Sequence, residues 1–131
     1  MGKYGKAAIR AQELLTVNRK LEPVSAWNRA VNEVFPNSPL SREKSCPRGA
    51  FLGLCSDGLV SGVPSGEYTL SKDNRRYARE AVKLLRKAPS LADKPDEVWK
   101  EIMRGEAKSE NSQMDVAISL WQAGAISKND V

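Results

Sequence analysis

Histidine is absent from the 131-residue sequence. This absence excludes serine–histidine and cysteine–histidine nucleophile pairs, acid–base catalysis by imidazole, and every zinc or iron site with a histidine ligand. Any chemistry would have to use carboxylates, lysine, tyrosine or backbone groups. We therefore favour a non-enzymatic role and expect no catalytic residues, no metal and no cofactor. A histidine-free enzyme with a pocket between helices stays open as an alternative.

Cysteine is nearly absent as well, with only Cys46 and Cys55 in the chain. Two cysteines are too few for a disulfide scaffold, and their spacing matches no Cys-x-x-Cys redox or zinc motif. In a helix the two would lie about 13 Å apart, beyond the roughly 7 Å limit for a disulfide. The sequence predicts two free thiols. Cys46 lies near Lys44 and Arg48, but no base is available to activate it for catalysis.

Long hydrophobic runs are also missing, because no 18 consecutive residues are apolar and the first ten residues lack the apolar core of a secretory signal. We expect a cytoplasmic protein with no membrane partner. The composition, 40% hydrophobic and 28% charged, is ordinary for a folded domain. The length suits one domain over residues 1–131, with residues 127–131 expected to fray at the C-terminus.

Apolar residues recur at the three-and-four spacing of a buried helix face in six segments. Prolines and N-cap residues, among them Pro23, Pro47, Ser71 and Asp93, mark several of the starts. The predicted helices begin near residues 3, 23, 47, 72, 94 and 112 and end near residues 18, 35, 57, 88, 104 and 123. The predicted fold is mainly α, a compact orthogonal bundle of five to six helices around one core. Residues 37–44 are expected to form a surface loop, and residues 59–70 either an irregular loop or a small β-hairpin.

Two glycines, Gly49 and Gly53, interrupt the third predicted helix four residues apart. Glycine inside a helix costs about 1 kcal/mol relative to alanine, so a close neighbour is expected to explain them. We expect this neighbour to be the backbone of another helix.

The fourth predicted helix carries an unusual concentration of positive charge on one face. At 100° per residue its seven cations fall within an arc of about 120°, opposite an apolar face. Only Asp73 and Glu80 oppose them in this segment, so its charge of +5 equals the net charge of the whole chain. The cations of this face are Lys72, Arg75, Arg76, Arg79, Lys83, Arg86 and Lys87.

Like charges one turn apart repel, and a polyanionic partner would explain why so many are kept together. Nucleic acid is the first candidate, because lysine and arginine contacts to phosphates give salt-sensitive affinity without reading a sequence. An acidic protein surface is the second. A winged helix–turn–helix arrangement is a further variant, with residues 59–70 as the wing. The alternatives are a merely solvated face and an interaction or structural module with no nucleic-acid role. Partner identity and oligomeric state stay open.

Other candidate residues have simpler explanations. Trp27, Trp99 and Trp121 lie on predicted apolar faces and are expected to anchor the core. The glycines of residues 62–66 lack the Gly-Lys-Ser/Thr ending of a phosphate-binding loop and indicate a turn.

Three stretches, Cys46–Cys55, Tyr68–Ala78 and Gln113–Gly124, resemble a family of small bacterial and phage proteins known only as a domain of unknown function. The resemblance covers nearly the whole chain. It implies single-domain size and a cytoplasmic location, and it transfers no functional residue. In the last stretch, Gln113 and Asp115 are expected to be exposed polar residues that cap a helix start.

Overall fold

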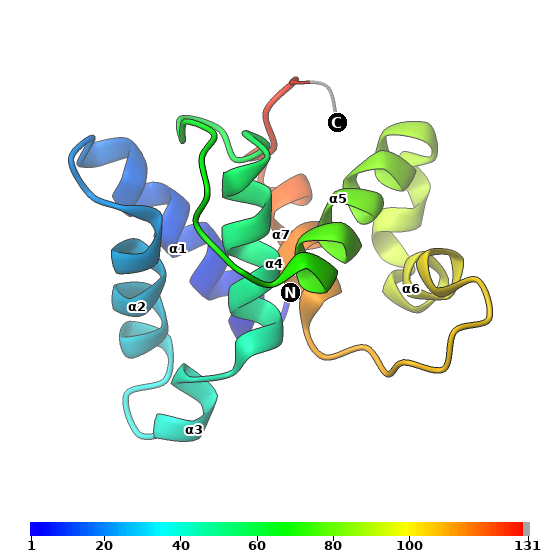
Figure 1. Ribbon diagram of the computed structural model, residues 1–131, viewed down its shortest axis with the longest axis horizontal. Helices are drawn as coiled ribbons and strands as arrows, with labels where there is room; N and C mark the ends of the chain where they lie inside the picture. The colour runs from blue at the N-terminus through cyan, green and yellow to red at the C-terminus, as the bar shows by residue number, and fades with distance from the viewer. Residues whose placement is uncertain (130–131) are drawn as a thin grey trace.

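Seven α-helices and one turn of 3-10 helix make up the computed structural model, which describes residues 1–129 (Figure 1). Six of the helices have nine or more residues, and α3 is a single turn. The elements are α1 (Lys3–Val17), α2 (Pro23–Val34), α3 (Pro39–Arg42), α4 (Ser45–Ser56), α5 (Lys72–Lys87), η1 (Pro89–Asp93), α6 (Pro95–Met103) and α7 (Gln113–Gln122). The prediction of a mainly helical bundle is confirmed.

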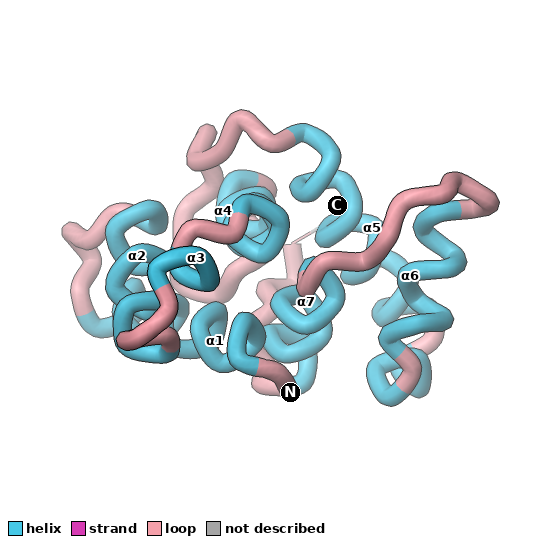
Figure 2. Tube along the Cα trace, turned by 90° about the horizontal axis from the view of Figure 1, so that it is seen from below, coloured by secondary structure: helices cyan, strands magenta, loops and turns pink. Residues whose placement is uncertain are grey.

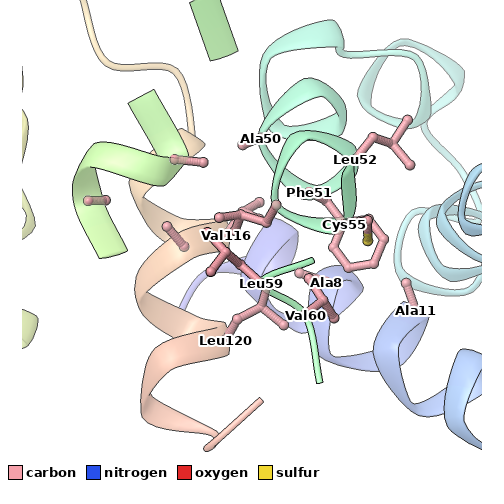
Figure 3. Packing of buried hydrophobic residues seen from close by; sticks show 14 of the residues in the cluster. Ala8, Ala11, Ala50, Phe51, Leu52, Cys55, Leu59, Val60, Val116 and Leu120 are labelled. Carbon is pink, nitrogen blue, oxygen red and sulfur yellow. The ribbon is translucent and has the colours of Figure 1, made fainter. Parts of the chain in front are cut away.

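Helices α4 and α7 lie in the middle of the bundle. Figure 2 shows α2 and α3 on one side of them and α5 and α6 on the other. Helix α4 is buried on nearly all sides. Small residues such as Gly49, Gly53 and Ser56 alternate with its large apolar ones and let neighbouring segments approach closely. In Figure 3 its Phe51 and Cys55 meet Ala8 of α1, close to Val116 and Leu120 of α7. These residues belong to one buried hydrophobic cluster, the core of residues 1–129.

Helix α3 was not predicted, since residues 37–44 were expected to form a loop. Its first residue is Pro39, and the Ser38 hydroxyl accepts a hydrogen bond from the Ser41 amide at 3.4 Å. One turn is too short to show helical periodicity, so only the local Ser-Pro signal could have indicated it. The expected cap at Asp93 is wrong in a similar way. Asp93 ends η1, and Lys94 holds the N-cap position of α6.

Residues 59–70 form an irregular loop rather than a hairpin. Within residues 1–129 the only β-type pairing is an isolated antiparallel bridge between Val60 and Ile126. The wing that a winged helix–turn–helix would need is therefore not formed. The same contact holds the C-terminal segment, because Ser127 donates from its amide to the Leu59 carbonyl at 2.8 Å and from its hydroxyl to the Gly58 carbonyl at 2.7 Å. The fraying expected for residues 127–131 falls in part on residues 130 and 131, which lie outside the described residues.

The two helical glycines of α4 lie against the start of α5, but only Gly53 meets the backbone of that helix, as was expected for both. A Cβ atom on Gly53 would lie 2.6 Å from the Cα of Arg75, and one on Gly49 would lie 2.9 Å from the Cβ of Asn74. A side chain would not fit at either distance. Gly53 therefore lets α4 touch the backbone of α5, and Gly49 makes room for the Asn74 side chain. This close approach sets the position of α5 and therefore of its cations.

No helix among the described residues is long and apolar enough to cross a membrane.

Candidate anion-binding face of helix α5

Helix α5 packs one face against α4 and α7 (Figure 1). Ser71 holds its N-cap position, and Asp73 in the first turn and Arg86 and Lys87 in the last turn complement the helix dipole. Its buried face consists of Asn74, Tyr77, Ala78, Ala81, Val82 and Leu85. The seven predicted cations all lie outside this face, but the structure divides them into two edges with different surroundings.

Three arginines, Arg75, Arg79 and Arg86, form what we call the paired edge. Arg75 donates to Oδ1 of Asp57 from Nη2 at 2.7 Å and from Nε at 2.9 Å, and Nη1 of Arg79 donates to Oδ2 at 3.3 Å. The Asp57 side chain, just beyond α4, is only 12% exposed. Both of its oxygens are therefore held by arginines of α5.

The rest of the paired edge is also committed to the fold. Nη1 of Arg75 lies 3.2 Å from Glu67, in the loop before α5. The hydrogen bonds to Asp57, followed by the nearby charges of Asp57 and Glu67, raise the pKa of Arg75 above its ordinary value. Nη2 of Arg86 donates to the Ser127 carbonyl at 2.8 Å. These three side chains join α5 to α4, to the loop 59–70 and to the C-terminal segment.

The other four cations, Lys72, Arg76, Lys83 and Lys87, form what we call the free edge. Lys72 and Lys87 are exposed and have no ion pair within the described part of the chain. Arg76 is 40% exposed and lies 3.8 Å from Glu106, while Lys83 is 41% exposed and lies 3.5 Å from Glu80 one turn away. Exposed pairs of this kind contribute about 0–1 kcal/mol, so an incoming anion can replace them.

Aromatic and acidic groups border the free edge on the side of α6. The Arg76 guanidinium lies 4.8 Å from the centre of the Tyr77 ring, and the Lys108 ammonium lies 5.4 Å from it. The rings of Tyr77 and Trp99 pack edge to face, with their centres 5.1 Å apart. A cavity of about 360 Å³ opens here between α5 and α6, with Glu80, Glu101 and Glu106 among its lining residues. The cations of α5 are thus not one uninterrupted strip, because acidic side chains oppose several of them.

Helical periodicity could find the cations but not these partners. Asp57 and Glu67 lie 18 and 8 residues before Arg75, outside the helix, and no motif links them to it.

A second difference concerns Gln113, which was expected to be exposed. Its side chain is 0% exposed; it donates to Asn74 Oδ1 at 3.0 Å and accepts from the Asn111 amide at 2.6 Å.

Asp115 does cap a helix, but not its own. It accepts hydrogen bonds from the amides of Gly2 and Gly5, at the start of α1, each at 2.7 Å. This contact could not be predicted from the sequence, because Asp115 lies more than 100 positions from Gly2 and Gly5.

The remaining candidates have structural roles. Trp27 and Trp99 are buried, as predicted, whereas Trp121 is half-buried against the core. Both cysteines are free thiols, and burial raises the pKa of Cys55 far above its ordinary value. Within residues 1–129 no group of three or more cysteine, aspartate or glutamate side chains is placed to hold a metal ion.

Comparison with known proteins gives one finding. Searches of curated proteins and of solved structures return no match to the chain. The model of one family, described as a family of unknown function (DUF6979), matches residues 1–127. This match spans every helix described above and agrees with the resemblance stated from the sequence. The chain therefore belongs to this family of unknown function, DUF6979.

Proposed function

We propose that the protein binds a polyanion, with the phosphate backbone of nucleic acid as the partner, through the free edge of α5. The observation that carries the proposal is the contrast between the two edges. Arg75 and Arg79 are held by a mostly buried carboxylate, whereas Lys72 and Lys87 are exposed and unpaired among the described residues. The cations of the paired edge are used in contacts within the fold, whereas those of the free edge are accessible to an anionic partner.

The geometry of the free edge suits an extended anion. Lys72, Arg76, Lys83 and Lys87 share an arc of about 60° at 100° per residue. The rise from Lys72 to Lys87 is about 22 Å at about 1.5 Å per residue. Several phosphates of one strand fall within that length. Each lysine or arginine that contacts a phosphate releases counterions, so the affinity should fall steeply with salt. A cytoplasmic location, expected from the sequence, is consistent with this proposal because nucleic acids are present there.

An acidic protein surface is the second candidate, and the glutamates beside the free edge favour it. Glu101 and Glu106 line the cavity next to Arg76, where they would repel a second phosphate strand. Lysines of a folded partner could pair with them instead. A partner of this kind would require the acidic and basic side chains together, whereas nucleic acid requires only the free edge.

The proposal is tested by titrating labelled duplex DNA with the protein at low salt and following fluorescence anisotropy. The variant Lys83→Glu with Lys87→Glu should bind at least about tenfold more weakly, because two phosphate contacts are lost and repulsion is added. The matched control is Lys6→Glu with Lys20→Glu, which changes the net charge equally at two exposed positions away from α5. The control should bind nearly as tightly as the wild type.

Two results would contradict the proposal. Equal loss in both variants would mean that only net charge matters, and absence of binding by the wild type at low salt would exclude nucleic acid. The variant Glu101→Lys with Glu106→Lys tests the second candidate. It should strengthen DNA binding, because two repulsive carboxylates are removed. It should weaken capture of an acidic protein that also carries surface lysines, because those lysines lose their partners.

A further inference from the structure

A second cavity, distant in the chain from α5, lies between the α1–α2 turn and the loop 62–68. Its volume is about 260 Å³, and its apolar lining includes Leu15, Leu21 and Val63. Leu15 and Val63 are buried members of the core, so the inner part of the cavity is an extension of the core surface. Pockets for drug-sized ligands measure roughly 300–1,000 Å³, so this cavity fits a smaller molecule.

One wall of the cavity is held rigidly by Tyr68. The Tyr68 amide donates to the Ser56 hydroxyl at 3.0 Å, and the Tyr68 hydroxyl donates to the Pro64 carbonyl at 2.8 Å. Gly66 permits this arrangement, because a Cβ atom there would lie 2.8 Å from the tyrosine ring. Tyr68 is thus held at its backbone amide and at its hydroxyl, so its ring forms a fixed surface, which lowers the entropic cost of binding a ligand against it.

The opposite wall is a tight turn that is fixed by Asn18. The Leu21 amide donates to the Asn18 carbonyl at 3.1 Å, and the Lys20 amide donates to the Asn18 side chain at 3.1 Å. Pro23, at the first position of α2, stiffens the exit from the turn. Both walls therefore exist before any ligand arrives.

Two opposite charges, Arg19 and Glu22, stand at this cavity without partners. Both residues line it, both are exposed, and within residues 1–129 neither belongs to an ion pair. Although they lie only three positions apart in the sequence, they do not pair with each other. Burial raises the pKa of Tyr68 most, and the charges of Cys55 and Glu22 raise it further. Glu22 is therefore close enough to act on the tyrosine ring that forms one wall.

We propose that this cavity binds a small zwitterion with an apolar side chain, of the size and chemistry of free leucine or phenylalanine. Arg19 pairs with the carboxylate, Glu22 pairs with the ammonium group, and Leu15, Leu21 and Val63 contact the apolar side chain. A guanidinium is well suited to a carboxylate because it can donate two parallel hydrogen bonds. This site is independent of the anion-binding edge of α5.

The test uses three ligands that differ in one charged group each: L-leucine, 4-methylpentanoate, which lacks the ammonium group, and 3-methylbutylamine, which lacks the carboxylate. Binding is followed by the shifts of backbone amide signals in NMR titrations of the full chain. Leucine should shift signals from residues 15–23 and 62–68 and should bind most tightly of the three. Leucine that shifts no signal in these two segments at millimolar concentration overturns the proposal.

Variants at the two charges assign the recognition. Arg19→Gln should weaken leucine and 4-methylpentanoate about tenfold or more and leave the amine unchanged. Glu22→Gln should weaken leucine and the amine and leave 4-methylpentanoate unchanged. Lys20→Gln, an exposed neighbour that does not line the cavity, is the control and should change none of the three. Because all three positions are exposed, the melting temperature should stay at the wild-type value. Equal effects of Arg19→Gln and Glu22→Gln on every ligand would overturn the assignment.

Discussion

At the scale of single residues, Asp57 determines how two cations of α5 are used. Its carboxylate is mostly buried and accepts hydrogen bonds from both Arg75 and Arg79. If one member of such a pair is removed, the remaining charges are left partly buried without a partner. Arg10 and Glu33 form a comparably short pair at 2.7 Å, but both side chains are more than 40% exposed. The difference between the two sites is burial rather than distance.

Asp57→Asn should lower the free energy of unfolding by about 2–3 kcal/mol, because two arginines lose their counter-charge in a partly buried site. The measurement is urea unfolding followed by circular dichroism. Glu33→Gln is the matched control and should leave the midpoint close to that of the wild type, since water solvates both partners there. Equal midpoints for the two variants would contradict the role given to Asp57.

The two thiols should differ in reactivity for the same reason of burial. Cys55 is fully buried and its pKa is raised, so it exposes almost no thiolate at neutral pH, whereas Cys46 is partly exposed. A thiol-specific reagent at pH 7–8 should modify one cysteine in the native protein and both in denaturant. Rapid modification of both in the native state would mean that the core around Cys55 opens readily.

At the scale of elements, the contact between α4 and α5 depends on missing side chains. Gly53 lets α4 touch the backbone of α5, and Gly49 leaves room for the start of that helix. This packing places Asp57 within reach of Arg75 and Arg79. The separation of the basic face into two edges follows from this packing.

Gly53→Ala should destabilise the protein by about 2 kcal/mol or more, because the added Cβ meets the backbone of α5 and not a flexible side chain. Gly105→Ala is an informative contrast, since nothing lies within 4 Å but its φ is +89°. That variant should cost about 1 kcal/mol from backbone strain alone. Thermal unfolding of both measures the difference, and a smaller effect at Gly53 would contradict the close packing of the helices.

The sequence could predict these elements because its signals are local. Prolines at helix starts and the spacing of apolar residues placed six helices to within a few residues, and Gly49 and Gly53 indicated the contact. The partners of the cations could not be predicted, because Asp57 meets Arg75 only after α4 and α5 have packed. A helical wheel gives the direction of Arg75 and Lys83 around the axis but not which neighbouring element lies there. The single turn α3 and the buried Gln113 were missed for related reasons: one turn has no periodicity, and burial of a polar side chain requires a partner from another helix.

At the scale of the whole molecule, one core joins all the longer helices. Trp27 stacks on Phe51 at one side of the bundle, and Trp99 packs on Tyr77 at the other. Both pairs belong to the same buried cluster. We therefore propose that the chain folds as one unit, and we expect its two sides to unfold together.

Urea unfolding should give one transition, with the same midpoint by tryptophan fluorescence and by far-ultraviolet circular dichroism. We expect one transition because the buried residues of α5 and α6 belong to the same cluster as those of the other helices. Trp27→Phe and Trp99→Phe variants, each followed by both methods, extend the test to the two sides separately. Two resolved transitions, or midpoints that differ between the methods, would show separate folding units.

The salt dependence of DNA binding tests most directly the claim that the free edge of α5 engages phosphates while the paired edge serves the fold. Each lost phosphate contact lowers the slope of log association constant against log salt concentration by about 0.9. Lys83→Gln with Lys87→Gln should therefore reduce the wild-type slope by about two, and Lys6→Gln with Lys20→Gln should leave it unchanged. The same slope in all three proteins would contradict the account.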